Sequence, residues 1–386
     1  MKKVLFLQNE NALGGVWYVN KSVAEALVKK GYDVSIVSIR NSLDKKLKCD
    51  KRIKLDIINN DSWNLMRKKD VIMPLKKLKL ISFLKNTFKY YKSHSKLKND
   101  YKKLKQYIIL NKPDYIIASH YQTLYGIPNE YLSKTLYEHH ASFDFLNEAK
   151  DNFNVLKKYN GKIYGYIWLS KAALNKALKN GFNKSFCIYN PVRFNCEKKA
   201  NVIQNKKIVV ITRIENYNKR INLMIEMVND IFKDKAFKNW SFDIYGLGEF
   251  DLESKKIINN NNQINYKGVT DNPKEVLLNS SISLNTSIFE GFSMSILEST
   301  MCGIPTVTFN HGESINEEVL KDKTGYVIKQ NDKKLYKEKL MYLMNDEDTL
   351  KKFSNNCKEY SNNFLIENII NKWIDLFKEM EKNDEN

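Results

Sequence analysis

The sequence has few cysteines and no long hydrophobic run. Its five cysteines are widely spaced and include no C-x-x-C pair, a pattern that indicates reduced thiols in a cytosol and neither a disulfide framework nor a zinc site. No stretch approaches the roughly 20 apolar residues that a membrane span needs. The apolar run within residues 1–15 is too short for a signal peptide. We therefore expect a cytoplasmic protein, either soluble or peripheral on the inner face of the cell membrane.

Positive charge is concentrated in the first half of the chain. Residues 1–200 hold 39 lysines and arginines against 16 acidic residues, whereas residues 201–386 hold 25 against 28. The densest stretch, from Lys76 to Lys105, contains eleven lysines and one acidic residue, Asp100. Apolar residues lie between these lysines at spacings of three and four, which predicts a basic amphipathic helix or helix pair.

Two interpretations of this basic stretch stay open. It is either a solvated helix face in a lysine-rich protein or a surface that contacts anionic lipid headgroups. Nucleic acid is a weaker choice, and we expect no nucleic-acid partner, because no helix-turn-helix, RNP or zinc-finger pattern accompanies the charge.

Short apolar strands alternate with helical patterns along the chain. The first half opens with a strand at 2–8, a glycine turn, a helix at 16–30 and a second strand at 33–39, which together make a βαβ unit. A polar segment without periodicity, residues 194–205, precedes a second alternating series. The predicted fold class is α/β, with two doubly wound, Rossmann-like domains and a cleft between the carboxyl edges of their sheets.

The apolar runs also give the expected strands and domain limits. The further strands are expected at 113–119, 134–140, 164–170, 186–190, 207–214, 242–248, 264–269, 281–287, 305–309 and 325–328. We divide the chain into an N-terminal domain (1–193), a linker (194–205), a C-terminal domain (206–363) and a final helix (364–386).

The most informative block is EGFSMSILESTMCGIPTVTF, residues 290–309. Glu290 follows an apolar strand, and Glu298, eight residues later, lies in a short helix that ends at Gly303. Backbone N–H groups at a helix start suit phosphate, and nearby carboxylates suit hydroxyl groups, which together favour a nucleotide-sugar. The structural alternative is a capping box, because Ser295 and Glu298 have the S-x-x-E spacing.

This block resembles the signature of the family 4 retaining glycosyltransferases, E-G-F-G/P-x-x-x-x-E-A-x-x-x-G-x-P-V-V. Ser293 replaces the usual glycine or proline and Ser299 the usual alanine, and both replacements are small residues. The glycine turn at Gly14 and Gly15 matches the family more loosely, as does the segment 190–192, Asn-Pro-Val. The resemblance implies the GT-B architecture, in which the last helix crosses back to the N-terminal domain.

The resemblance also implies roles for single residues. Glu290 would contact hydroxyls of the transferred sugar, and Glu298 would bind the ribose hydroxyls. Arg213 and Lys219 would bind the two phosphates and stabilise the leaving pyrophosphate without a metal. Their spacing is six where five is common, so Arg220 stays an alternative to Lys219. The remaining expected donor-binding residues are Gly14, Gly15, Gly246, Val269, Gly291, Phe292, Ser293, Met294 and Ser295.

Two adjacent histidines, His139 and His140, end the strand at 134–140. Neighbouring residues on a strand point to opposite faces and cannot share one metal ion, and no carboxylate or cysteine is spaced to complete a site. In the resembled family a histidine at this strand end hydrogen-bonds the donor sugar. The Glu-His pattern favours His139 for this catalytic position, with His140 as the alternative.

The resulting hypothesis is a retaining, metal-independent glycosyltransferase without a cofactor. It would move a hexose or N-acetylhexosamine from a nucleotide-sugar, expected to be UDP-linked, to a surface-polysaccharide or lipid-linked glycan. The alternatives are a GT-B sugar-nucleotide epimerase, a synthase with a soluble acceptor, and a non-catalytic protein that binds polyanions or membranes. The stretch from Lys76 to Lys105 would supply contact with an anionic membrane.

Overall fold

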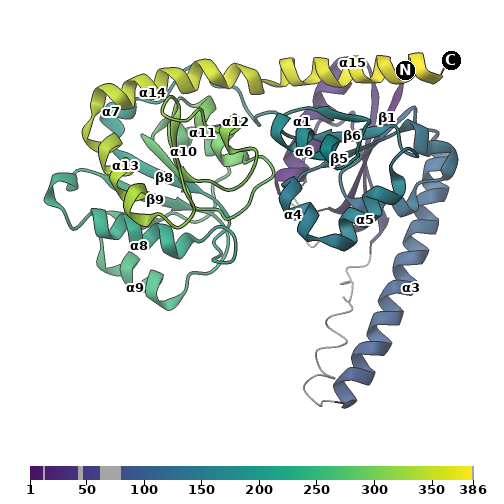
Figure 1. Ribbon diagram of the computed structural model, residues 1–386, viewed down its shortest axis with the longest axis horizontal. Helices are drawn as coiled ribbons and strands as arrows, with labels where there is room; N and C mark the ends of the chain where they lie inside the picture. The colour runs from purple at the N-terminus through teal and green to yellow at the C-terminus, as the bar shows by residue number, and fades with distance from the viewer. Residues whose placement is uncertain (12–13, 42–46, 61–79, 385–386) are drawn as a thin grey trace.

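Two α/β domains lie side by side in the computed structural model, which describes residues 1–11, 14–41, 47–60 and 80–384 (Figure 1). Within this part of the chain, the N-terminal domain holds a seven-stranded sheet in the order β3-β2-β1-β4-β5-β6-β7. Every pair of neighbouring strands in it is parallel. Its strands are β1 (Lys3–Asn11), β2 (Asp33–Asn41), β3 (Lys54–Asn59), β4 (Tyr115–Ala118), β5 (Thr135–His139), β6 (Gly165–Trp168) and β7 (Ser185–Cys187).

The C-terminal domain repeats this architecture with a six-stranded parallel sheet in the order β10-β9-β8-β11-β12-β13. The strands are β8 (Lys207–Ile211), β9 (Ser241–Tyr245), β10 (Ile264–Tyr266), β11 (Ile282–Asn285), β12 (Thr306–Phe309) and β13 (Gly325–Ile328). Central strands such as β4 and β12 are buried along their whole length, as expected for parallel strands covered by helices on both faces. The predicted fold class is confirmed.

Helices cover both faces of each sheet (Figure 1). In the N-terminal domain they are α1 (Gly15–Lys29), α3 (Leu80–Asn111), α4 (Phe143–Glu148), α5 (Lys150–Tyr159) and α6 (Lys171–Lys179). In the C-terminal domain they are α8 (Ile221–Ile231), α9 (Leu252–Asn260), α10 (Pro273–Leu278), α11 (Met294–Met301), α12 (Ile315–Glu318), α13 (Lys333–Asn345) and α14 (Glu347–Tyr360).

The basic stretch forms one continuous helix over most of its length. Residues 76–79 lie outside the described part, and α3 then runs for 32 residues from Leu80 to Asn111. Its second half packs on the sheet through Leu104 and Ile108, while its first half protrudes from the body of the domain (Figure 1). Its exposed lysines are Lys85, Lys89, Lys92, Lys96, Lys98, Lys102, Lys103 and Lys105.

The segment 194–205 between the domains packs against the C-terminal domain. Cys196 and Ala200 are buried in that domain's core, and Val202 begins the short helix α7 (Val202–Asn205). The Ala200 N–H donates to the Cys302 carbonyl at 2.8 Å. All five cysteines are free, although the Sγ atoms of Cys196 and Cys302 lie only 3.3 Å apart.

The last helix, α15 (Ile366–Asp384), runs from the C-terminal domain across to the N-terminal domain, along the top of Figure 1. Its apolar face joins the N-terminal core through Trp373 and Phe377. The Phe377 ring stacks on Tyr115 of β4 at 4.2 Å between centroids, and the Tyr115 hydroxyl donates to Glu381 at 2.7 Å. These contacts tie the end of the chain to the N-terminal sheet.

Two carboxylates of the C-terminal domain cap helices of the N-terminal domain. Glu317 accepts the backbone N–H groups of Lys171 and Ala172 at the start of α6, each at 2.9 Å. Glu313 accepts the N–H of Phe143 at the start of α4. Because helix N-termini carry unpaired N–H groups and partial positive charge, each carboxylate stabilises the helix that it caps. The two domains are therefore held together across the cleft.

Candidate active site

A cleft of about 720 Å³ lies between the domains at the carboxyl ends of β8 and β11. These two strands adjoin where the strand order of the C-terminal sheet reverses, the point at which doubly wound sheets bind ligands. The expected site residues that line this cleft are Gly15, Arg213, Lys219, Glu290, Gly291, Phe292, Ser293, Met294 and Ser295.

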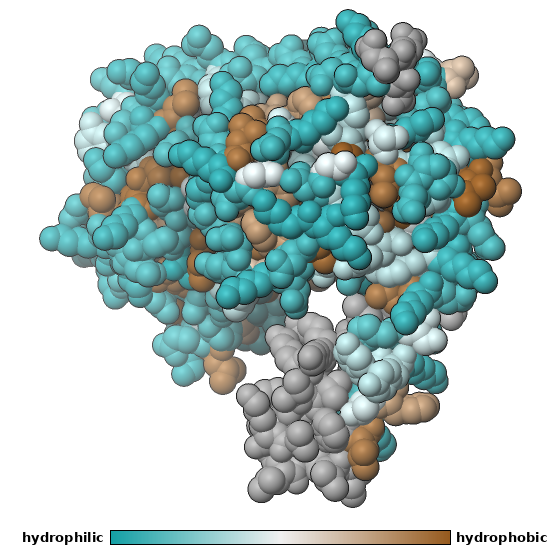
Figure 2. Space-filling model, turned by 45° about the vertical axis from the view of Figure 1, so that its right-hand side comes forward, coloured by the Kyte–Doolittle hydropathy of each residue, from teal (hydrophilic) through white to brown (hydrophobic). Residues whose placement is uncertain are grey.

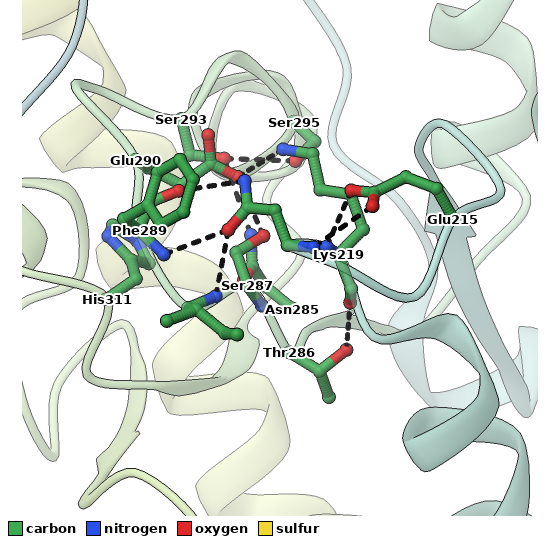
Figure 3. A network of polar contacts seen from close by, with 12 residues as sticks. Glu215, Lys219, Asn285, Thr286, Ser287, Phe289, Glu290, Ser293, Ser295 and His311 are labelled. Carbon is green, nitrogen blue, oxygen red and sulfur yellow. Dashed lines mark hydrogen bonds and ion pairs between the residues drawn. The ribbon is translucent and has the colours of Figure 1, made fainter. Parts of the chain in front are cut away.

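A partly buried ion pair between Lys219 and Glu290 lines the cleft (Figure 3). The Ser287 hydroxyl donates to Glu290 Oε1 at 2.7 Å, and Glu215 accepts the backbone N–H of Lys219 at 2.8 Å. Burial by itself raises the pKa of Glu290, but the positive charges of Lys219 and His311 outweigh it and hold this pKa below its usual value. Glu290 is therefore an ionised hydrogen-bond acceptor at neutral pH.

His311 and Glu318 lie behind this pair, both fully buried. His311 Nε2 is 3.4 Å from Glu318 Oε2, and the same carboxylate oxygen accepts the Ser293 N–H at 3.0 Å. Burial lowers the pKa of His311, but the charges of Glu318 and Glu290 raise it above the usual value. Lys219, Glu290, His311 and Glu318 thus alternate in charge and fix the position of the Glu290 carboxylate.

Arg213 is the exposed cation of this cleft. It follows β8, lines the cleft, and its guanidinium makes no hydrogen bond or ion pair with the residues that the structure describes. Arg220 instead donates to Thr286 O at 2.8 Å and to Gln330 Oε1 at 2.6 Å, and it lies over the Phe309 ring. Lys219, and not Arg220, therefore accompanies Arg213 in the cleft.

Gly291 brings the two domains into close contact. A Cβ atom at this position would lie 2.3 Å from the carbonyl oxygen of His140 in the N-terminal domain. Only glycine fits such an approach without moving one domain. The glycine of the E-G-F motif therefore has a packing role between the domains in addition to lining the cleft.

The structure places the expected catalytic histidine, His139, and its alternative, His140, in different surroundings. His139 is buried beside Tyr137 and Trp168 in the N-terminal core, and burial lowers its pKa to about 3, so it is neutral. His140, the alternative, lines the cleft and lies 3.2 Å from Glu138 through Nε2. Alternation along β5 points His139 into the core, so that of the two histidines His140 lines the cleft.

Glu298, expected to bind the donor ribose, does not line the cleft in this structure. Its side chain is 2% exposed, and both carboxylate oxygens accept hydrogen bonds from the Arg193 guanidinium. The capping-box alternative fails: α11 begins after Ser293, and Glu298 caps nothing at that helix start. Arg193 is thus a residue that the sequence argument missed, although it directly follows the Asn-Pro-Val segment.

Three further expected donor-binding residues lie outside the cleft lining. Gly14 precedes α1 as its N-cap. Gly246 has φ +151°, and a Cβ there would lie 1.7 Å from the Thr212 carbonyl oxygen, so the turn after β9 requires glycine. Val269 is 64% exposed beyond the end of β10. Among the described residues, no group of three or more His, Cys, Asp and Glu side chains is arranged to hold a metal ion.

The two doubly wound domains with an interdomain cleft define the GT-B fold. Residues 193–360 match the family model "Glycosyl transferases group 1". The chain thus has the GT-B fold, and its residues 193–360 are similar to the group 1 glycosyltransferases.

Two curated relatives extend this match. The chain is 28% identical over 246 residues, 62% of its length, to a poly(ribitol-phosphate) alpha-N-acetylglucosaminyltransferase of Staphylococcus aureus, and it spans about half of that relative (49%). It is 25% identical over 385 residues to an uncharacterized glycosyltransferase of Haemophilus influenzae, covering 97% of this chain and 99% of that protein.

A solved structure shares the whole fold. The crystal structure of a mutant of S. aureus TarM, in complex with Fondaparinux, alpha-GlcNAc-glycerol and UDP, superposes with a TM-score of 0.74 at 17% identity. The superposition covers 98% of this chain and 100% of that chain.

Proposed function

We propose that this protein is a retaining glycosyltransferase that moves a hexose or N-acetylhexosamine from a UDP-sugar to a glycan acceptor rich in phosphate. The observation that carries the proposal is the Lys219–Glu290 pair beside the exposed Arg213 in one interdomain cleft. The names of the Staphylococcus relatives support both substrates, since one acts on poly(ribitol-phosphate) and the other was crystallised with UDP.

The side chains of the cleft divide the chemistry between them. Arg213 and Lys219 supply fixed positive charge where the pyrophosphate leaves, which stabilises the developing negative charge in the transition state. The ionised Glu290 accepts hydrogen bonds from sugar hydroxyls and orients the transferred ring. Because two cations of the chain serve the phosphates, we propose that the reaction needs no metal ion.

The protruding part of α3 is the proposed membrane contact. Leu84 is 61% exposed and Phe88 70% exposed on this part of the helix, and apolar residues are visible near its end in Figure 2. Lysines flank them, and each lysine near an anionic membrane contributes about 1 kcal/mol. None of the helices in the described part of the chain is long and apolar enough to span a bilayer. Peripheral docking would bring the cleft to a lipid-linked acceptor.

A thermal-shift panel of UDP-, GDP- and ADP-sugars tests the donor, followed by transfer to a polyol-phosphate polymer and mass analysis of the product. We expect a UDP-sugar to stabilise the protein most and the product to keep the anomeric configuration of the donor. Absence of stabilisation by every nucleotide-sugar would refute the donor assignment. Conversion of the donor to an isomer without transfer would favour the epimerase instead.

A further inference from the structure

The contact between Arg193 and Glu298 closes the carboxylate that the family resemblance connects with ribose. Arg193 Nη2 donates to Glu298 Oε2 at 2.6 Å, and Nε donates to Oε1. The pair is bidentate, the strongest geometry for a guanidinium and a carboxylate. With a side chain 2% exposed, Glu298 has no accessible oxygen for another donor in this arrangement.

Burial explains why Glu298 needs a partner. Burial raises the pKa of Glu298, and the hydrogen bonds and charge of Arg193 oppose that rise. A buried carboxylate without a partner is strongly unfavourable. An empty donor site therefore requires some group to take the place of a ligand at Glu298.

A guanidinium edge and the ribose cis-diol offer similar hydrogen bonds. Each presents two neighbouring donors, N–H groups in one case and the 2′ and 3′ hydroxyls in the other, and a carboxylate accepts either pair through its two oxygens. Ribose can therefore replace Arg193 at Glu298 without leaving a buried acceptor unpaired.

A cavity next to Arg193 can hold its side chain after it leaves Glu298. Arg193 lies on the segment that joins the domains, and its guanidinium also lies 4.4 Å from the Tyr18 ring of α1. It lines a second cavity, of about 430 Å³, formed by α1, residues 192–195 and the start of α15. Glu25 and Glu367 line the same cavity, as do Lys29 and Lys30.

We propose that Arg193 is a positioning residue that holds Glu298 in the empty site and is exchanged for the ribose hydroxyls when a nucleoside diphosphate enters. The inference rests on the proposed function, because it assumes that the donor carries ribose. Arg193 then competes with the ribose hydroxyls for Glu298, and only a complete cis-diol replaces both guanidinium donors. The residue thereby weakens the binding of ribonucleotides more than the binding of their 2′-deoxy forms.

Calorimetric titration with UDP and 2′-deoxy-UDP tests the exchange in wild type and in Arg193→Gln. Glutamine cannot make the bidentate contact, so we expect UDP to bind roughly tenfold more tightly to the variant, equivalent to 1.4 kcal/mol. Binding of 2′-deoxy-UDP should change much less, which increases the ratio of the two affinities. An unchanged ratio, or weaker binding of UDP to the variant, would overturn the inference.

Two further variants separate exchange from general damage. Arg193→Lys keeps the positive charge without the bidentate donor. Its ratio of UDP affinity to 2′-deoxy-UDP affinity should lie between those of wild type and Arg193→Gln. Glu298→Gln removes the negative charge that accepts hydrogen bonds from Arg193 or from ribose, and it should bring the affinities for UDP and 2′-deoxy-UDP close together. Retention of the wild-type ratio would contradict the exchange. Melting curves of each variant show whether it is folded. If wild type and variants all bind no nucleoside diphosphate, the proposed function falls and the inference falls with it.

Discussion

Replacing Arg213 by alanine should separate catalysis from stability. The guanidinium is exposed in the cleft and pairs with no described residue, so its removal leaves no buried partner unpaired. A substitution at such a position changes the free energy of unfolding by no more than about 0.5 kcal/mol. Urea unfolding of the Arg213→Ala variant should therefore match that of wild type.

The transfer rate of the same variant should fall steeply. In the proposed function Arg213 is one of two fixed cations beside the leaving pyrophosphate, and loss of one strong transition-state donor typically costs about 2.7–4 kcal/mol, or roughly 100- to 1,000-fold in rate. Initial rates of transfer from the preferred nucleotide-sugar measure this loss. Both proteins should keep their rates in EDTA if the cations of the chain replace a metal ion. A variant that keeps more than about a third of the wild-type rate would refute this role.

Arg220 provides the matched control. Arg220→Ala removes the same charge but also loses hydrogen bonds to Thr286, Gln330 and Asn331. Each hydrogen bond of a charged group contributes roughly 1.5–3 kcal/mol at most, so this variant should melt at a clearly lower temperature. Equal melting temperatures of the Arg213 and Arg220 variants would contradict the distinction drawn between the two side chains.

Three other substitutions test separate parts of the structure. Glu290→Gln should abolish most transfer. The folded pKa of Glu290 is depressed, so the stabilisation by this carboxylate is present above its usual pKa and disappears as pH falls through the folded pKa. Urea unfolding of wild type and variant should therefore converge in acid, and a constant difference would contradict the ion pair. Gly291→Ala should hold the domains apart and increase the radius of gyration in X-ray scattering, since its Cβ would meet His140 O; an unchanged radius would contradict the close contact. Reversing the charges of Lys85 and Lys89 should remove binding to anionic vesicles at low salt but leave donor hydrolysis intact. Reversing the charges of two exposed lysines of the C-terminal domain should leave vesicle binding unchanged. Equal vesicle binding by wild type and both variants would indicate a solvated helix.

The central strands could be predicted from sequence because they are fully buried. Apolar runs such as 113–119 and 305–309 became β4 and β12. Strand β3 (Lys54–Asn59) was missed because it lies at the sheet edge, where half-exposed polar residues replace the apolar run. Burial on both faces is thus the signal that a single sequence carries best.

The candidate site could be predicted in part. Arg213, Lys219 and Glu290 stand at fixed places in a strand–turn–helix pattern, and that pattern brings them to one edge of the sheet. The pairing of Arg193 with Glu298 spans 105 positions and depends on how the hinge packs against α11. The choice between neighbouring histidines depends on which face of β5 turns to the core. Neither depends on local sequence.

The interdomain caps connect opening of the cleft with the order of the N-terminal domain. When the domains separate, Glu313 and Glu317 leave α4 and α6, and the first turns of both helices lose their acceptors. Amide hydrogens of Phe143, Lys171 and Ala172 should then exchange with solvent at the frequency of domain opening. Three backbone amides of the N-terminal domain would therefore report, without any label, how often this cleft opens.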